Sequence, residues 1–159
     1  MEISITVVQV IQAMLAPGIM ISACGLLLLG MNNKYSLVVN RIRLLGEERR
    51  KFSIKASHEE FLYQDEIRLK SISIQLEKLI YRVKLVRNAV LSYSIAVGLF
   101  VITSMQIGFS FILKAPEAES LIISSFSLGM LLVFIGICYA AVETIKGYEI
   151  INYEIKAHE

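Results

Sequence analysis

Very few side chains in this sequence have the type and spacing needed for catalysis or for binding a metal or a phosphate group. The two histidines, His58 and His158, stand far apart, and no Cys/His cluster has the spacing of a metal site. A glycine-rich phosphate loop and a serine elbow are both absent, and the acids near residue 60 lack the spacing of a calcium loop. We therefore predict neither an enzyme nor a bound cofactor or metal.

Polar side chains inside otherwise apolar segments are more informative. A small and polar stripe along one segment, with two glutamines in an earlier one, comprises Ser92, Ala96, Thr103, Gln106, Ser110, Gln9 and Gln12. Polar groups in hydrocarbon are costly, so they should face protein or water. Two interpretations stay open: hydrogen bonding between helices, or the lining of a pore. Glu117 and Glu119 would then ring the outer mouth of the pore, although capping of the next helix explains them equally well.

Small residues also follow one face of the last apolar segment. They are Ser125, Gly129, Gly136 and Ala140, and Glu143 lies on the same face near its inner end. Small residues at four-residue spacing let helix backbones approach closely. Because three helices alone enclose little space, this face favours a closed homo-oligomer.

The elements that carry these residues are three charge-free windows. No Asp, Glu, Lys or Arg occurs in residues 3–33, 88–113 or 120–142, and each window exceeds the ~20 residues that cross a bilayer as a helix. None shows the alternation of a barrel strand. We predict an all-α integral membrane protein with transmembrane helices over 1–33, 88–113 and 120–143.

The basic residues predict the orientation. Thirteen of the 16 Lys and Arg residues lie in the segment 34–87, so the positive-inside rule makes this segment cytoplasmic. The N-terminus and the link 114–119 are then outside, and the tail 144–159 is inside. Basic residues close to the inner membrane face should contact lipid headgroups: Arg41, Arg43, Arg82, Lys84 and Arg87. Acids alternate with bases further along the segment, so we expect no nucleic-acid partner.

Heptad spacing organises the segment 34–87 as a helical hairpin. On the first arm an apolar stripe follows alternating three- and four-residue steps, broken once by Arg49: Tyr35, Val38, Ile42, Leu45 and Phe52. On the return arm the two seam positions are held by Leu62, Leu69, Leu76, Val83 and Val90, and by Ile72, Leu79 and Val86. This pattern predicts an antiparallel coiled coil. Ser57 to Glu60 match a capping box, which predicts a turn near 53–57.

Three stretches carry a resemblance to a known family. Residues 16–29 read APGIMISACGLLLL, residues 32–35 read NNKY, and residues 40–45 read NRIRLL. The chain resembles the small membrane proteins catalogued as domain of unknown function 2721, with Lys34 where an arginine is more usual. The resemblance implies a prokaryotic plasma membrane and no established activity. In layout alone the chain is also similar to ExbB- and TolQ-like proton-channel subunits, which form rings.

Two functions fit these observations. The first is a homo-oligomeric, ion-conducting channel whose hairpins form a cytoplasmic stalk. The second is a non-conducting scaffold or sensor that binds a cytoplasmic protein through the hairpin. Expected partners are membrane lipids and further copies of the chain, with ions in the first case and an unidentified protein in the second.

Overall fold

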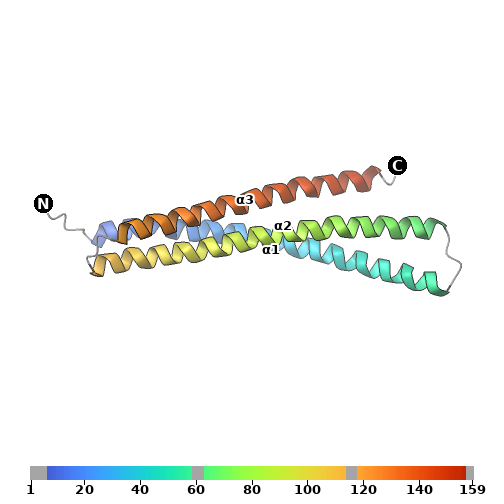
Figure 1. The fold of residues 1–159 in the computed structure, drawn as a ribbon, viewed down its shortest axis with the longest axis horizontal. Coiled ribbons are helices and arrows are strands. Elements are labelled where there is room, and N and C mark those ends of the chain that lie inside the picture. Colours follow the sequence, from blue (N-terminus) through green and yellow to red (C-terminus); the bar gives the residue numbers. More distant parts are fainter. Residues whose placement is uncertain (1–6, 59–62, 114–117, 157–159) are drawn as a thin grey trace. The chain divides into compact units, whose positions relative to one another are not determined.

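The chain forms three long helices. The computed structural model describes residues 7–58, 63–113 and 118–156, with side chains over 7–55, 65–112 and 119–148. In chain order the helices are α1 (Val7–His58), α2 (Tyr63–Leu113) and α3 (Ala118–Lys156), each drawn as one ribbon in Figure 1. The all-helical prediction is confirmed.

Each helix is long and apolar enough to cross a membrane. The most apolar 18-residue windows of α1, α2 and α3 have mean hydropathies of 2.0, 2.0 and 2.5. Large apolar side chains in these windows point outward, and Ile19, Leu26 and Ile112 are 65–73% exposed. Such a surface is costly in water and suits a hydrocarbon solvent. By length and composition, the chain therefore has the helices of a multi-pass membrane protein.

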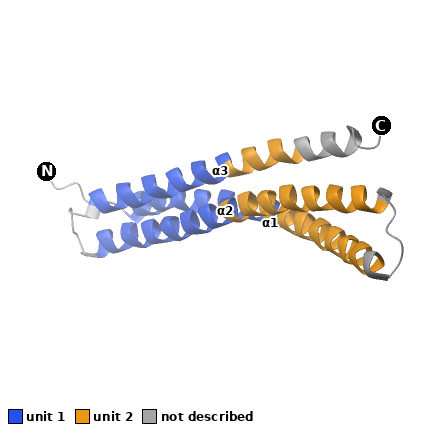
Figure 2. Cartoon of the chain, turned by 45° about the vertical axis from the view of Figure 1, so that its right-hand side comes forward, with its two compact units in different colours: residues 1–30, 89–138 blue, residues 31–88, 139–159 orange. Residues whose placement is uncertain are grey.

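Two compact units divide the helices between them (Figure 2). Unit 1 takes the described residues of 1–30 and 89–138, and unit 2 takes those of 31–88 and 139–159. Every helix thus contributes one part to each unit. In unit 1 the buried side chains come from all three helices, for example Cys24, Phe100 and Val133.

Unit 2 is built around the predicted seam of the hairpin. Val38 and Leu45 of α1 form a buried cluster with three seam residues of α2, Ile72, Leu76 and Leu79. The partly buried Ile42, Phe52 and Val83 pack against this cluster. Fully burying such a side chain contributes about 1.5–3 kcal/mol. The seam residues therefore meet as the heptad spacing predicts, whereas the supercoil itself stays a prediction.

Ion pairs connect the two arms of the hairpin beyond this cluster. Arg68 Nη2 lies 2.9 Å from Glu48 Oε1, and Lys55 Nζ lies 3.6 Å from Asp65 Oδ2. Residue numbers rise on α1 as they fall on α2, so the arms run antiparallel.

The predicted position of the hairpin turn is wrong. Residues 53–58, including Ser57 and His58, are helical and belong to α1, and α2 begins at Tyr63. No glycine or proline follows Gly46 before Gly98, so nothing in the chain stops the first arm early. The packing of Phe52 on the seam also favours continuation of the helix. The other capping-box residues, Glu59 and Glu60, lie outside the described residues.

Candidate functional site: a buried ion cluster and a polar cluster

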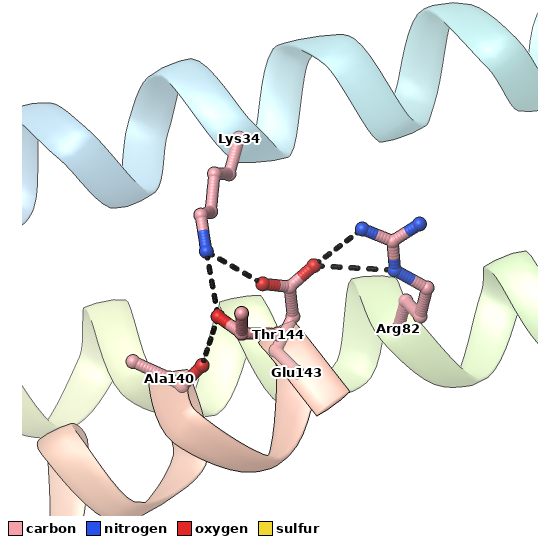
Figure 3. A network of polar contacts seen from close by, with 5 residues as sticks. All are labelled: Lys34, Arg82, Ala140, Glu143 and Thr144. Atoms are coloured by element: carbon pink, nitrogen blue, oxygen red, sulfur yellow. Dashed lines mark hydrogen bonds and ion pairs between the residues drawn. The ribbon is translucent and has the colours of Figure 1, made fainter. Parts of the chain in front are cut away.

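A fully buried carboxylate joins the three helices within unit 2. Glu143 of α3 is 0% exposed, and its two oxygens face different cations (Figure 3). Lys34 of α1 places Nζ 2.9 Å from Oε2. Arg82 of α2 donates to Oε1 from Nη2 at 2.6 Å and from Nε at 3.1 Å. A buried charge is stable only when it is paired and hydrogen-bonded. This carboxylate has one cationic partner on α1 and one on α2.

Neighbouring residues of α3 complete the site. Lys34 Nζ also donates to Thr144 Oγ1 at 3.0 Å, and this hydroxyl donates to the carbonyl of Ala140 at 3.0 Å. Gly147 leaves room for Arg82, because a Cβ there would lie 2.9 Å from Nη2. Lys34 and Arg82 differ in exposure, with 44% of the lysine side chain and 20% of the arginine side chain accessible. The site therefore links the three helices through one carboxylate and two cations, and its net formal charge is +1.

The basic residues predicted to meet lipid headgroups separate into two kinds. Arg82 directs its guanidinium at Glu143. The others are exposed: Arg41, Arg43, Lys84 and Arg87. Exposure allows lipid contact at these four, and that contact stays a prediction.

A second polar cluster lies within unit 1. Ser125 Oγ of α3 lies 2.9 Å from Thr103 Oγ1 and 2.8 Å from Gln106 Oε1, both on α2. Thr103 Oγ1 also donates to the carbonyl of Leu99 at 2.8 Å. Thr103 is only 2% exposed. Two members of the predicted pore-lining stripe are therefore hydrogen-bonded to α3 of the same chain, as the first of the two interpretations expects.

The rest of that stripe is spread over several environments. Ala96 is fully buried, Ser92 and Ser110 are half-buried, and Gln9 and Gln12 are exposed. Glu119 is exposed in the first turn of α3, and Glu117 lies outside the described residues.

One pocket in unit 1 brings several of these residues together. It has a volume of about 450 Å³, and its polar lining includes Gln9, Thr103, Ser110 and Glu119. The stripe placed Thr103 and Ser110 on one face, and the pore-lining interpretation grouped Gln9 and Glu119 with them. Their presence in one pocket leaves both interpretations of the stripe open.

The small-residue face of α3 packs closely, and it packs on α2. A Cβ added to Gly136 would lie 2.6 Å from the ring of Tyr93, and one added to Gly129 would lie 2.8 Å from the ring of Phe100. Both rings are buried, and Phe100 also contacts Phe126 with ring centroids 5.5 Å apart. The neighbours of these two glycines are thus side chains of α2, and close approach of the helix backbones stays a prediction. Within one chain these two glycines are already covered, so they are not free to pack between copies.

Sequence reasoning missed the ion cluster as a unit. It placed Glu143 at the inner end of a span, and it treated Arg82 as a lipid anchor. The usable signal was that Glu143 is the one acidic residue between Glu119 and Glu149. A carboxylate in so apolar a stretch needs a cation from another helix, and Lys34 and Arg82 stand beside the inner ends of the other two predicted spans.

Comparison with known proteins identifies a family and nothing closer. No curated protein and no solved structure matches the chain. The layout likeness to ExbB- and TolQ-like subunits thus stays an expectation. A family model matches residues 14–153, which is most of the chain and includes both clusters. The chain therefore belongs to the family described as "Protein of unknown function (DUF2721)".

Proposed function

We propose that this protein is a non-conducting membrane scaffold whose helical hairpin binds a cytoplasmic protein. Three spans anchor the chain in a prokaryotic plasma membrane, with the N-terminus outside. The segment 34–87, which holds 13 of the 16 basic residues, then lies in the cytoplasm.

The observation that carries this proposal is a set of exposed apolar side chains on the hairpin. On α1, Leu37 and Leu44 are 70% and 61% exposed and stand seven residues apart. On α2, Ile67 and Tyr81 are also about half exposed or more, and they stand two heptads apart. They occupy other heptad positions than the seam residues, which are already buried against each other.

Exposed apolar residues that recur at heptad spacing on a charged segment support a contact surface there. Seven-residue spacing places Leu37 and Leu44 on one side of α1, where an amphipathic helix of a partner would lie along them. The charged residues around them would set the specificity of that contact.

Two further observations favour a scaffold over a channel. Thr103 Oγ1 and Gln106 Oε1 both lie within hydrogen-bonding distance of Ser125 Oγ in the same chain, so these two atoms already have a neighbouring polar group inside the protein. Gly129 and Gly136 are covered by side chains of α2, so these two positions of the small-residue face are less available for contacts between copies.

Site-specific photocrosslinking in intact cells tests the proposal. A photoreactive residue at Leu44 or Ile67 should give a discrete heavier adduct, because the partner lies over these positions. The same residue at Glu47 or Arg50, which are exposed and polar on the same arm, serves as the control. Adducts of equal yield at all four positions, or no adduct at Leu44 and Ile67, would contradict the proposal that the hairpin binds a partner.

A channel is the second candidate, and the pocket in unit 1 favours it. Three of the predicted pore-lining residues, Gln9, Thr103 and Ser110, share this pocket with the proposed mouth residue Glu119. Conduction would require several copies around a shared path. Purified protein in liposomes should pass no cation, anion or proton under voltage or a pH gradient if it is a scaffold, whereas reproducible flux would favour the channel.

A further inference from the structure

The pocket in unit 1 has three polar residues at one end and a mostly apolar interior, which also includes the hydroxyl residues Thr103 and Ser127. Gln9 stands near the start of α1, Ser110 near the end of α2, and Glu119 at the start of α3, so these three mark one end of the unit. Pro17, Ile107 and Phe126 line the pocket farther along the same helices. A molecule that filled the pocket would place a polar head at the helix ends and an apolar body below it.

The size and openness of the pocket suit a membrane-derived ligand. Its volume of about 450 Å³ falls in the range of about 300–1,000 Å³ usual for small-molecule sites. Several lining residues are exposed, among them Ala13, Ala16 and Ile123, whereas Pro17 at its base is buried. These exposed residues lie on the apolar surface of unit 1, which hydrocarbon surrounds when the helices span a bilayer. The pocket is thus entered from the lipid phase.

Charge selects among the lipids that could enter. Among the lining residues that the structure describes, Glu119 is the one charged residue, and it stands at the polar end. A carboxylate there attracts a cationic head and repels an anionic one.

From these features we propose that the pocket binds one lipid chain whose headgroup carries a primary ammonium group, as in phosphatidylethanolamine. The chain occupies the apolar interior, and the ammonium group lies against Glu119. This binding site is independent of the scaffold proposed above, because it uses unit 1 alone.

Native mass spectrometry of the purified full-length protein tests this site. The protein is exchanged into detergent with equal amounts of phosphatidylethanolamine and phosphatidylcholine of identical acyl chains. One lipid should be retained, with a preference of about two- to fivefold for phosphatidylethanolamine. Its ammonium group can donate hydrogen bonds to Glu119, whereas the equally charged quaternary ammonium of phosphatidylcholine has no hydrogen to donate. Glu119→Gln should abolish the preference and keep the retained lipid.

Filling the pocket separates the site from general lipid binding. Ala13→Leu places a larger side chain in the lining and should abolish retention of both lipids. Ala16→Leu is a second variant with the same expectation, in case the first folds poorly. Ala23→Leu, an exposed position on α1 outside the lining, is the matched control and should retain lipid as the wild type does. Equal retention of the two lipids by the wild type, or unchanged retention in both pocket variants when helix content is preserved, would overturn the proposal.

Discussion

Arg82 donates two hydrogen bonds to a single oxygen of Glu143, from Nη2 at 2.6 Å and from Nε at 3.1 Å. The other carboxylate oxygen accepts from Lys34. One acidic side chain of α3 is therefore held by a cation of each of the other helices (Figure 3). Because the carboxylate is fully buried, its charge depends on these two partners for compensation.

The first prediction follows from that dependence. Arg82→Met leaves a buried carboxylate with Lys34 alone, whose side chain is 44% exposed. Removing one partner of a buried pair costs about 3–5 kcal/mol. We expect the free energy of unfolding to fall by an amount near the lower end of this range. The measurement is thermal unfolding of the protein in mild detergent. Lys34→Met should cost less than about 1 kcal/mol, because solvent screens an exposed cation.

Two further variants make this test specific to the ion cluster. Arg43→Met alters an exposed arginine and should change stability by no more than about 0.5 kcal/mol. The double variant Arg82→Met with Glu143→Leu removes the stranded carboxylate, so it should be more stable than Arg82→Met alone. If the double variant is less stable than Arg82→Met, then Arg82 does not stabilise the protein by compensating the charge of Glu143.

A second prediction concerns the contact of Gly136 with Tyr93. In Gly136→Ala the added methyl group would lie 2.6 Å from the tyrosine ring, which is 1% exposed and has little room to move. Overpacking of this kind costs about 1–3 kcal/mol in unfolding stability. Gly98→Ala is the control, because no atom lies within 4 Å of the added Cβ, and it should be neutral or stabilising. Tyr93→Leu should relieve part of the cost of Gly136→Ala in the double variant.

Much of the fold could be predicted because its signals are local. Three charge-free windows predict three helices, and heptad spacing predicts which residues of the hairpin are buried, such as Leu45 and Leu79. The turn could not be located in this way. The capping box at Ser57 is a local preference worth about 1 kcal/mol, and continuation of α1 outweighs it.

The candidate sites were predicted less well, because pairing between helices is not local. The face with Gly129 and Gly136 was recognisable as a packing face, but its partner was not. The aromatic residues that cover it, Tyr93 and Phe100, come from another helix. In the same way Glu143 was visible as an isolated acid, whereas the register of three helices decides which cations reach it.

A third prediction separates hydrogen bonding between helices from a wet path. Thr103→Val removes the hydroxyl that contacts Ser125 and should cost about 0.6–1.7 kcal/mol, the range for hydrogen bonds between spanning helices. Its effect should be non-additive with that of Ser125→Ala in a double-mutant cycle. Ser94 is the control, because its hydroxyl donates to the carbonyl of Val90 on its own helix, so Ser94→Ala should add independently. Additive effects of Thr103 and Ser125 would show that the two hydroxyls do not interact.

The fourth prediction concerns orientation and follows from the distribution of basic residues. Single cysteines replace Glu119 or Lys51, both exposed in the structure, in a background that lacks Cys24 and Cys138. With 13 of the 16 Lys and Arg residues in 34–87, this segment should stay in the cytoplasm. A membrane-impermeant thiol reagent added to intact cells should then label the Glu119→Cys variant. The Lys51→Cys variant should be labelled only after the cells are permeabilised, which also controls for its accessibility. Labelling of Lys51→Cys in intact cells would place the hairpin outside, and the proposed cytoplasmic partner would have no access to Leu44 and Ile67.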